Sequence, residues 1–204
     1  VQDARAAGIF NISLDLMLGT PRQTADGLCQ TFDFIRRMDV PHISAYMLKI
    51  EQGTPFFKLR DKLDLPSEEE VADLYLETVS ALQSQGLFQY EISNFAKPGF
   101  ESRHNSKYWE LAPYLGIGKS AHSFWGGRRF YYDRDFRIVD DGTGGGREER
   151  ILLGLRLAKG IEKTLVKKDY TPYVKAGFMK ENGSRLAFTP KGFLVSNTIL
   201  SELI

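Results

Sequence analysis

The 204-residue chain is poor in cysteine, has no long hydrophobic run and shows almost no excess of either charge. Its single thiol, Cys29, excludes a disulfide framework and fits a reducing compartment, so we expect a cytoplasmic protein. Without an apolar run of membrane length, the sequence offers no candidate for a transmembrane helix. The 27 lysine and arginine residues face 26 aspartate and glutamate residues. The chain as a whole therefore has no electrostatic preference for polyanions.

The two ends of the chain have features of their own. Residues 147–204 carry 11 basic and 6 acidic side chains, which leaves 16 basic and 20 acidic side chains in residues 1–146. Such a basic tail binds nucleic acid or an acidic partner in some proteins, although a solvated surface is the commoner explanation. The first residues, VQDARAAG, have the pattern of the end of a helix. We therefore expect the chain to be the C-terminal part of a longer protein.

Strands and helices alternate in the first half of the chain. The segment 10–18, FNISLDLML, alternates between two faces: apolar residues occupy one, and Asn11, Ser13 and Asp15 share the other with Met17. Periodicity and end signals then predict a helix over 24–38, a strand over 42–48, a helix over 67–85 and a strand over 88–94. Two helical crossovers between three strands require parallel pairing. We predict an α/β fold in which these strands form half of a β/α barrel, with polar groups facing its interior.

The second half of the chain is richer in glycine and in turns. Gly126-Gly127 and the aromatic run 130–132 predict a hairpin that extends the first sheet. The glycine-rich segment 133–146 has the composition of a flexible linker. Residues 147–204 predict a helix, a second helix, a β-hairpin and a last helix, which is the order of a small winged-helix module. The predicted domains are therefore a partial barrel with its sheet extension over 1–132, the linker, and the tail module.

Asp15 is the acidic residue whose place in the fold is most informative. On an inward-facing strand of a parallel barrel, near the C-terminal end of that strand, it points toward the region where barrels of this kind have their sites. The alternative is a carboxylate in the barrel interior that pairs with a neighbouring polar group. Spacing alone leaves both possibilities open.

The segment HNSKYW, residues 104–109, contains a second candidate site. His104 and Tyr108 are one helical turn apart, so the imidazole and the phenol ring can share a face. Histidine is an axial ligand of heme iron in many proteins, and aromatic side chains pack on porphyrins. In the alternative interpretation Asn105 caps a helix, His104 is a surface residue, and Tyr108 and Trp109 belong to the core.

Several segments resemble the HemW-type heme chaperones and the related oxygen-independent coproporphyrinogen III oxidases of the radical SAM superfamily. DLMLGTP, residues 15–21, resembles the D-L-x-x-G-L-P segment of this family, and HNSKYW matches its HNxxYW heme-binding motif. YEISNFA, residues 90–96, and YLGIG, residues 114–118, stand on either side of that motif. The resemblance covers about the C-terminal half of the family's length and implies a radical SAM-type barrel followed by the winged-helix module.

The resemblance assigns roles to individual residues. It implies that Asp15 binds S-adenosylmethionine through the ribose hydroxyls, and that Lys49 and His122 contact the same cofactor largely through their backbone. For Lys49 and His122, ordinary strand-end residues are the alternative. Thr20 stands where the family has leucine, and Arg22 stands where glycine is common, but neither departure affects the aspartate.

The resemblance also implies that His104, Asn105, Tyr108 and Trp109 bind heme, with His104 as the iron ligand. The family holds a [4Fe–4S] cluster with three cysteines in the spacing C-x3-C-x2-C. Cys29 alone cannot provide this site, so we expect the cluster to be held by a segment outside this chain.

The implied function is heme binding and delivery to heme-accepting proteins, in porphyrin and heme metabolism. The alternative within the superfamily is an oxygen-independent coproporphyrinogen III oxidase, which decarboxylates propionate side chains by radical chemistry. A rival of another class is a winged-helix protein that binds nucleic acid. The predicted last helix, residues 191–204, has one lysine and is otherwise largely apolar, whereas a recognition helix carries several basic or amide side chains. We therefore expect no nucleic-acid partner.

Overall fold

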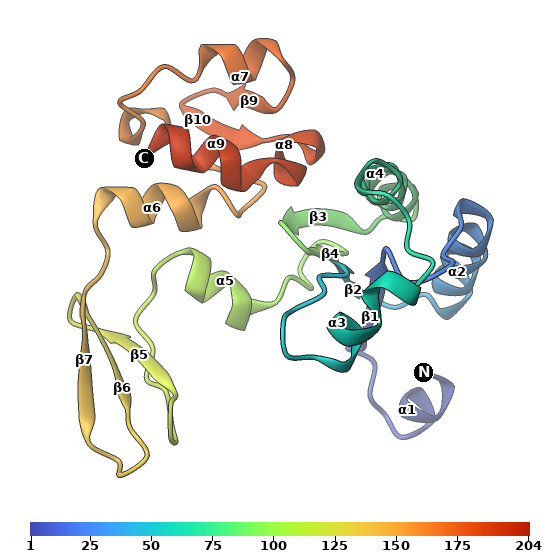
Figure 1. Ribbon diagram of the computed structural model, residues 1–204, viewed down its shortest axis with the longest axis horizontal. Helices are drawn as coiled ribbons and strands as arrows, with labels where there is room; N and C mark the ends of the chain where they lie inside the picture. Colours follow the sequence, from blue (N-terminus) through green and yellow to red (C-terminus); the bar gives the residue numbers. More distant parts are fainter. The chain divides into compact units, whose positions relative to one another are not determined.

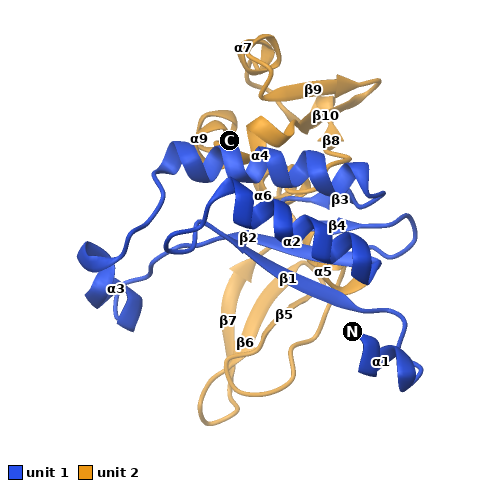
Figure 2. Ribbon diagram, turned by 90° about the vertical axis from the view of Figure 1, so that its right-hand side faces the viewer, with its two compact units in different colours: residues 1–101 blue, residues 102–204 orange.

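The computed structural model describes all 204 residues, and they form two compact units, residues 1–101 and 102–204 (Figure 1). Each unit has its own sheets and its own buried apolar residues (Figure 2). This division falls at residue 101, whereas the predicted first domain extends to residue 132. None of the helices is both long enough and apolar enough to cross a membrane.

The first unit consists of one four-stranded sheet with helices. Its elements are α1 (Gln2–Ala6), β1 (Ser13–Leu18), α2 (Ala25–Met38), β2 (His42–Met47), α3 (Pro55–Leu59), the 3₁₀ helix η1 (Arg60–Lys62), α4 (Glu68–Ser84), β3 (Phe88–Glu91) and β4 (Asn94–Ala96). The starts of α2 and α4 agree with the predicted ranges 24–38 and 67–85 to within one residue. The Thr24 hydroxyl accepts a hydrogen bond from the Gly27 N–H, and Ser67 and Glu70 form a reciprocal capping box.

The sheet has strand order β1-β2-β4-β3 and two chemically different faces. The predicted parallel pairing of β1 with β2 is confirmed. Apolar strand residues such as Leu18 and Ile43 are fully buried on the face that α2 and α4 cover (Figure 2). The opposite face carries a polar row, in which Asp15 of β1 pairs with Ser44 of β2 and Ser44 pairs with Asn94 of β4. The predicted alternation of polar and apolar faces is therefore confirmed.

The predicted third strand, residues 88–94, is wrong in extent and in pairing. The chain reverses within it, so that β3 and β4 form an antiparallel hairpin, and β4 pairs antiparallel with β2. The reversal has a local cause, because the Glu91 carboxylate accepts a hydrogen bond from the Ser93 N–H at 3.0 Å. The α4 crossover does bring β3 parallel to β2, but β4 lies between them.

The second unit contains two three-stranded sheets and several short helices. Its elements are α5 (Arg103–Trp109), β5 (His122–Trp125), β6 (Arg128–Tyr132), β7 (Ile138–Thr143), α6 (Arg147–Gly154), β8 (Ile161–Glu162), the 3₁₀ helix η2 (Lys163–Leu165), α7 (Thr171–Lys175), β9 (Met179–Asn182), β10 (Arg185–Phe188), α8 (Pro190–Leu194) and α9 (Ser196–Leu203). One sheet has the order β5-β6-β7 and the other has the order β8-β10-β9.

The β5–β6 hairpin forms where Gly126-Gly127 predicted it. Both glycines have positive φ, at 58° and 75°, as a tight two-residue hairpin turn requires. The hairpin does not extend the first sheet, however, because its other partner is β7. The prediction of a flexible linker over 133–146 is also wrong for β7, which lies in that segment as the edge strand of this sheet. The high glycine content of this segment led to the prediction of a linker in place of the strand.

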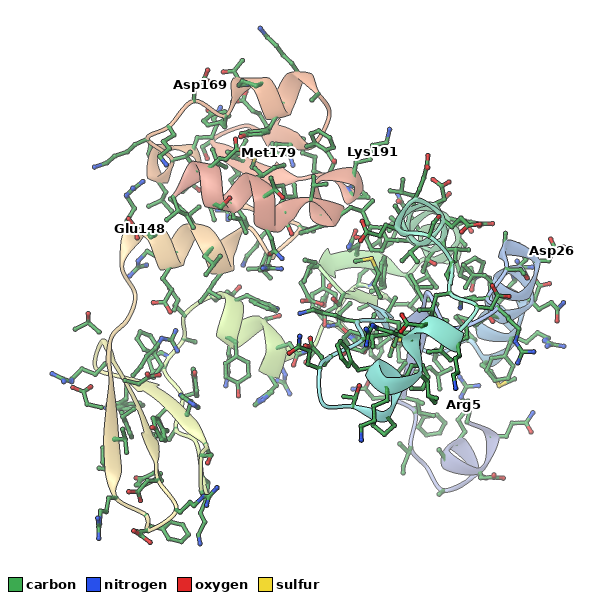
Figure 3. The ribbon with its side chains drawn as sticks, in the orientation of Figure 1. Arg5, Asp26, Glu148, Asp169, Met179 and Lys191 are labelled. Atoms are coloured by element: carbon green, nitrogen blue, oxygen red, sulfur yellow. The ribbon has the colours of Figure 1, made fainter.

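The tail of the second unit has a core of its own. Met179 of β9 is buried with Leu186 and Phe188 of β10, whereas Asp169 and Lys191 lie at the periphery (Figure 3). The predicted hairpin is present as β9 and β10, with Gly183 and Ser184 as its turn because Asn182 is still paired with Arg185. The predicted last helix is divided into α8, which ends just before Val195, and α9, which starts just after it.

Candidate cofactor-binding sites

The polar row on the first sheet has an exposed end and a buried end. Asp15 is the third of the six residues of β1 and is exposed, so it lies nearer the middle of the strand than the predicted C-terminal end. Its neighbours Ser44 and Asn94 are buried. The amide oxygen of Asn94 has no hydrogen-bond partner, although a buried unpaired acceptor costs about 1–3 kcal/mol. This row therefore combines an exposed carboxylate with a buried amide oxygen that has no hydrogen-bond partner.

A buried histidine on the same face escaped the sequence analysis. His42 lies between two hydroxyl groups, with Nδ1 2.7 Å from Ser13 Oγ and Nε2 2.9 Å from the Tyr90 hydroxyl. Burial lowers the pKa of His42, and the nearby Asp15 carboxylate opposes this effect in part. A neutral imidazole can accept from one hydroxyl and donate to the other. The alternation that places Ser44 on the polar face also places His42 there, so the signal was present in the sequence.

Lys49 and His122 lie in different units, and the side chain of each has a partner. Lys49 follows β2, is exposed, and donates to Glu51 with Nζ 2.9 Å from Oε1, which raises the pKa of the lysine. His122 opens β5 with its Nδ1 3.3 Å from Asp141 Oδ2 and its ring 4.9 Å from that of Tyr131. These contacts involve side chains only. The predicted backbone contacts with S-adenosylmethionine stay predictions.

The HNSKYW segment forms the seven-residue helix α5. Its N-cap is Ser102, whose hydroxyl accepts from the Asn105 N–H at 3.3 Å, so the alternative in which Asn105 caps the helix is wrong. His104 and Tyr108 share an exposed face, as predicted. The Tyr108 hydroxyl lies 3.1 Å from His104 Nε2, and the two rings meet edge to face with centroids 5.0 Å apart.

The other two residues of the motif lie away from this exposed face. Asn105 and Trp109 are also one turn apart, and both are half-buried. Trp109 lines a cavity of about 260 Å³ together with Gly154 at the end of α6 and Ile161 of β8. Its indole N–H is buried and has no hydrogen-bond partner. The motif therefore has an outward pair, His104 and Tyr108, and an inward pair, Asn105 and Trp109.

The residues of the chain fit the three implied cofactors unequally. Cys29 is an exposed thiol on α2, and no three histidine, cysteine, aspartate or glutamate side chains converge on one point. A [4Fe–4S] cluster does not fit this chain, because such a cluster requires several thiolate ligands. The outward pair fits heme, since it combines an exposed imidazole with an aromatic ring. Asp15 and Asn94 fit the hydroxyl groups of a nucleoside, since both offer hydrogen-bond acceptors.

The fold identifies the structural class. No family model matches the chain. The solved structure of coproporphyrinogen III oxidase (HemN) from Escherichia coli, described as a radical SAM enzyme, is similar with a TM-score of 0.71 and 20% sequence identity; the match covers 98% of this chain and 56% of that one. The chain therefore has the α/β fold of part of a radical SAM enzyme.

Sequence comparison identifies the family. The chain is 34% identical to the heme chaperone HemW of Bacillus subtilis over 232 residues, a match that covers 98% of the chain and 61% of the relative. It is 30% identical to HemW of Lactococcus lactis, over 100% of the chain and 61% of the relative. It is 38% identical to the mouse mitochondrial radical S-adenosyl methionine domain-containing protein 1, over 73% of the chain and 31% of the relative.

The chain belongs to the family of HemW-type heme chaperones and coproporphyrinogen III oxidase-like radical SAM proteins. It spans about three fifths of the length of the two HemW proteins it matches.

Proposed function

We propose that the chain binds heme through His104, and that the protein to which it belongs carries heme to acceptor proteins. The observation that supports this most directly is the outward pair of α5, in which an exposed imidazole stands against the edge of an exposed phenol ring. The bacterial relatives quoted above are named heme chaperones. We extend the proposal to this chain because residues 104–109 match the HNxxYW motif of the family.

The residues of α5 would have different roles in heme binding. His104 offers a nitrogen lone pair, and the Tyr108 ring offers an apolar surface beside it. Heme supplies an iron with an axial coordination position and a planar apolar ring. Because Tyr108 now occupies His104 Nε2, this hydrogen bond must break before that nitrogen can coordinate a metal. Asn105 and Trp109 would keep the helix in place from its inward side.

A second part of the proposal concerns S-adenosylmethionine. Asp15 would accept hydrogen bonds from the two ribose hydroxyls, which a carboxylate does with the assistance of its charge. The unpaired Asn94 amide oxygen supports a polar ligand at this row. Lys49 and His122 would contribute backbone contacts, and the iron–sulfur cluster would be held by a segment outside this chain.

The architecture supports a finer proposal as well. We propose that the parallel β1–β2 pair belongs to a partial barrel, and that the elements from α6 to α9 form a winged-helix-like module. We also propose a cytoplasmic location, which the single cysteine supports. In the tail, Ile199, Leu200 and Leu203 of α9 are buried, which speaks against α9 as a helix that reads DNA bases.

Hemin titration of the whole protein tests the main proposal. Hemin bound through His104 should give a shifted Soret band, and His104→Ala should weaken binding by roughly tenfold or more, the range found for changes near a metal ligand. Circular dichroism should stay unchanged, because His104 is exposed. Unaltered hemin affinity in His104→Ala, together with decarboxylation of coproporphyrinogen by the wild-type protein, would favour the oxidase instead.

A further inference from the structure

The outward pair of α5 is held from behind by a second tyrosine. Tyr114 meets the Tyr108 ring edge to face, with centroids 4.6 Å apart and an interplanar angle of 81°. Tyr114 is itself fixed to β5, because its N–H and C=O exchange two hydrogen bonds with Phe124 at 2.8 and 2.9 Å. Edge-to-face contacts have a preferred geometry, so the position of one ring restricts the other. Tyr114 therefore connects the outward pair to the β5–β6–β7 sheet.

Tyr114 is held in turn by a half-buried ion pair. Arg129 of β6 donates from Nη1 to the Tyr114 hydroxyl at 3.2 Å and from Nε to Glu149 Oε1 at 3.0 Å. The guanidinium also lies over the Phe124 ring, 5.0 Å from its centroid. Only about a quarter of each charged side chain is exposed, at 24% for Arg129 and 25% for Glu149. Arg129 Nε and Nη2 both donate to Glu149 Oε1, and two hydrogen bonds from one guanidinium restrict its orientation more than one does.

The glycine-rich segment before α6 closes over this ion pair. The Gly145 N–H donates to Glu149 Oε2 at 2.5 Å. A Cβ atom added at Gly144 would lie 2.8 Å from Phe124 Cε2 and 3.2 Å from Arg129 Nε, so any side chain there would force Phe124 and Arg129 to shift. Gly146, two residues later, has nothing within 4 Å of the same position and has φ of −63°. A side chain at Gly144 would therefore displace the residues around the ion pair, whereas a side chain at Gly146 would not.

We propose that Tyr114, Arg129 and Glu149 are positioning residues for His104. This inference rests on the proposed function, since His104 is the ligand that the contacts would orient. The contacts run without a gap from the Glu149 carboxylate through Arg129 and Tyr114 to the Tyr108 ring, and from that ring, edge to face, to the His104 ring. One end is the half-buried ion pair, and the other end is the exposed imidazole. None of the three positioning residues belongs to the HNSKYW segment.

The first test needs no heme. In the whole protein with isotope-labelled histidine, the ring resonance of His104 is assigned by its loss in His104→Ala. Gly144→Ala should shift this resonance, because the added methyl group displaces Phe124 and Arg129. Gly146→Ser, a preferred residue for a helix N-cap, should leave it in place, and His42 serves as an internal reference in both variants. An unchanged His104 resonance in Gly144→Ala, with the protein folded, would overturn the proposal.

The second test is a double-mutant cycle with hemin. Tyr114→Leu should weaken hemin binding about two- to tenfold, the equivalent of one lost aromatic pair. The same substitution should have no further effect in a His104→Ala background, because Tyr114 acts through His104. An equal loss in both backgrounds would make Tyr114 a direct heme contact and would overturn its positioning role. An unchanged affinity in Tyr114→Leu would overturn it as well.

The two tests separate this inference from the proposed function. If wild-type protein binds no hemin, or binds it equally after His104→Ala, heme binding at His104 is wrong, while the resonance test still decides whether the contacts orient the imidazole. A purely structural role for Arg129 predicts a lower melting temperature of Arg129→Met with unchanged hemin binding per folded molecule. The positioning role predicts weaker binding and an altered Soret spectrum, with partial recovery in Arg129→Lys, which keeps the ion pair with Glu149.

Discussion

His42 and Tyr90 are joined on the polar face of the first sheet, with the imidazole Nε2 2.9 Å from the phenol oxygen. The imidazole is buried, and its pKa is lowered below the ordinary value of 6.5. A histidine of this kind is neutral in the folded protein over a range of pH in which it is already charged in the unfolded chain.

The free energy of unfolding should therefore decrease as the pH is lowered, because of the buried His42 imidazole. Below about pH 6.5 the unfolded chain binds a proton that the folded protein does not, so unfolding becomes more favourable until the folded pKa is reached. Urea unfolding at about pH 8 and about pH 5.5 should show the loss, and His42→Gln should show less of it. The carboxylates are common to both proteins, so the difference isolates His42. An identical pH dependence in the two proteins would contradict a buried neutral imidazole.

Tyr108→Phe should bind hemin more tightly than the wild type does. The substitution keeps the ring beside His104 but removes the hydroxyl that occupies Nε2. The expected gain is about twofold, because an exposed hydrogen bond contributes at the lower end of the usual range, about 0.5 kcal/mol. Tyr108→Ala, which also removes the ring, should bind more weakly. Hemin titrations of the three proteins decide this, and a marked loss in Tyr108→Phe would mean that the hydroxyl contacts the heme.

Asp15→Ala should weaken S-adenosylmethionine binding in the whole protein without unfolding it. Charge-assisted hydrogen bonds contribute about 1.5–3 kcal/mol, so we expect a loss of roughly tenfold to a hundredfold by calorimetric titration. Asp26→Ala is a matched control, since Asp26 is an exposed aspartate on α2 (Figure 3). Equal affinities in the two variants would remove Asp15 from the site.

The chain expressed by itself should not assemble an iron–sulfur cluster. Cys29 is its only cysteine, and it is exposed on α2. Anaerobic incubation with iron and sulfide should leave no broad absorbance near about 400 nm of the thiolate–cluster kind. Stoichiometric cluster binding by this chain would show that ligands other than cysteine are used.

Local signals in the sequence predicted local structure well. The strict alternation around Asp15 gives the two faces of β1, and the spacing of His104 and Tyr108 gives the exposed pair. Each of these depends only on the period of a strand or a helix, which neighbouring residues determine. The same rule places His42 on the polar face, where its contacts became evident only with Tyr90, 48 residues away, in position.

The errors arose where tertiary pairing decides the outcome. Residues 88–94 are compatible with one strand until Glu91 binds the Ser93 N–H and reverses the chain. The segment 133–146 has the composition of a linker, yet a side chain at Gly144 would crowd Phe124 and Arg129. A sequence shows that glycine is present, but it does not show whether the reason is flexibility or close contact.

The two-sided character of α5 would make the affinity for a ligand on its outward face depend on the stability of the segment behind it. A helix of seven residues is not stable by itself in water, because the few hydrogen bonds of two turns do not offset the free-energy cost of nucleating the helix. Its shape therefore depends on Trp109, which lines the cavity next to α6 and β8. Any molecule that binds the folded α5 through its outward pair must raise the melting temperature of that neighbourhood, as linkage requires. A substitution that loosens Trp109 would accordingly change the affinity for a ligand of the outward pair from the opposite side of the helix.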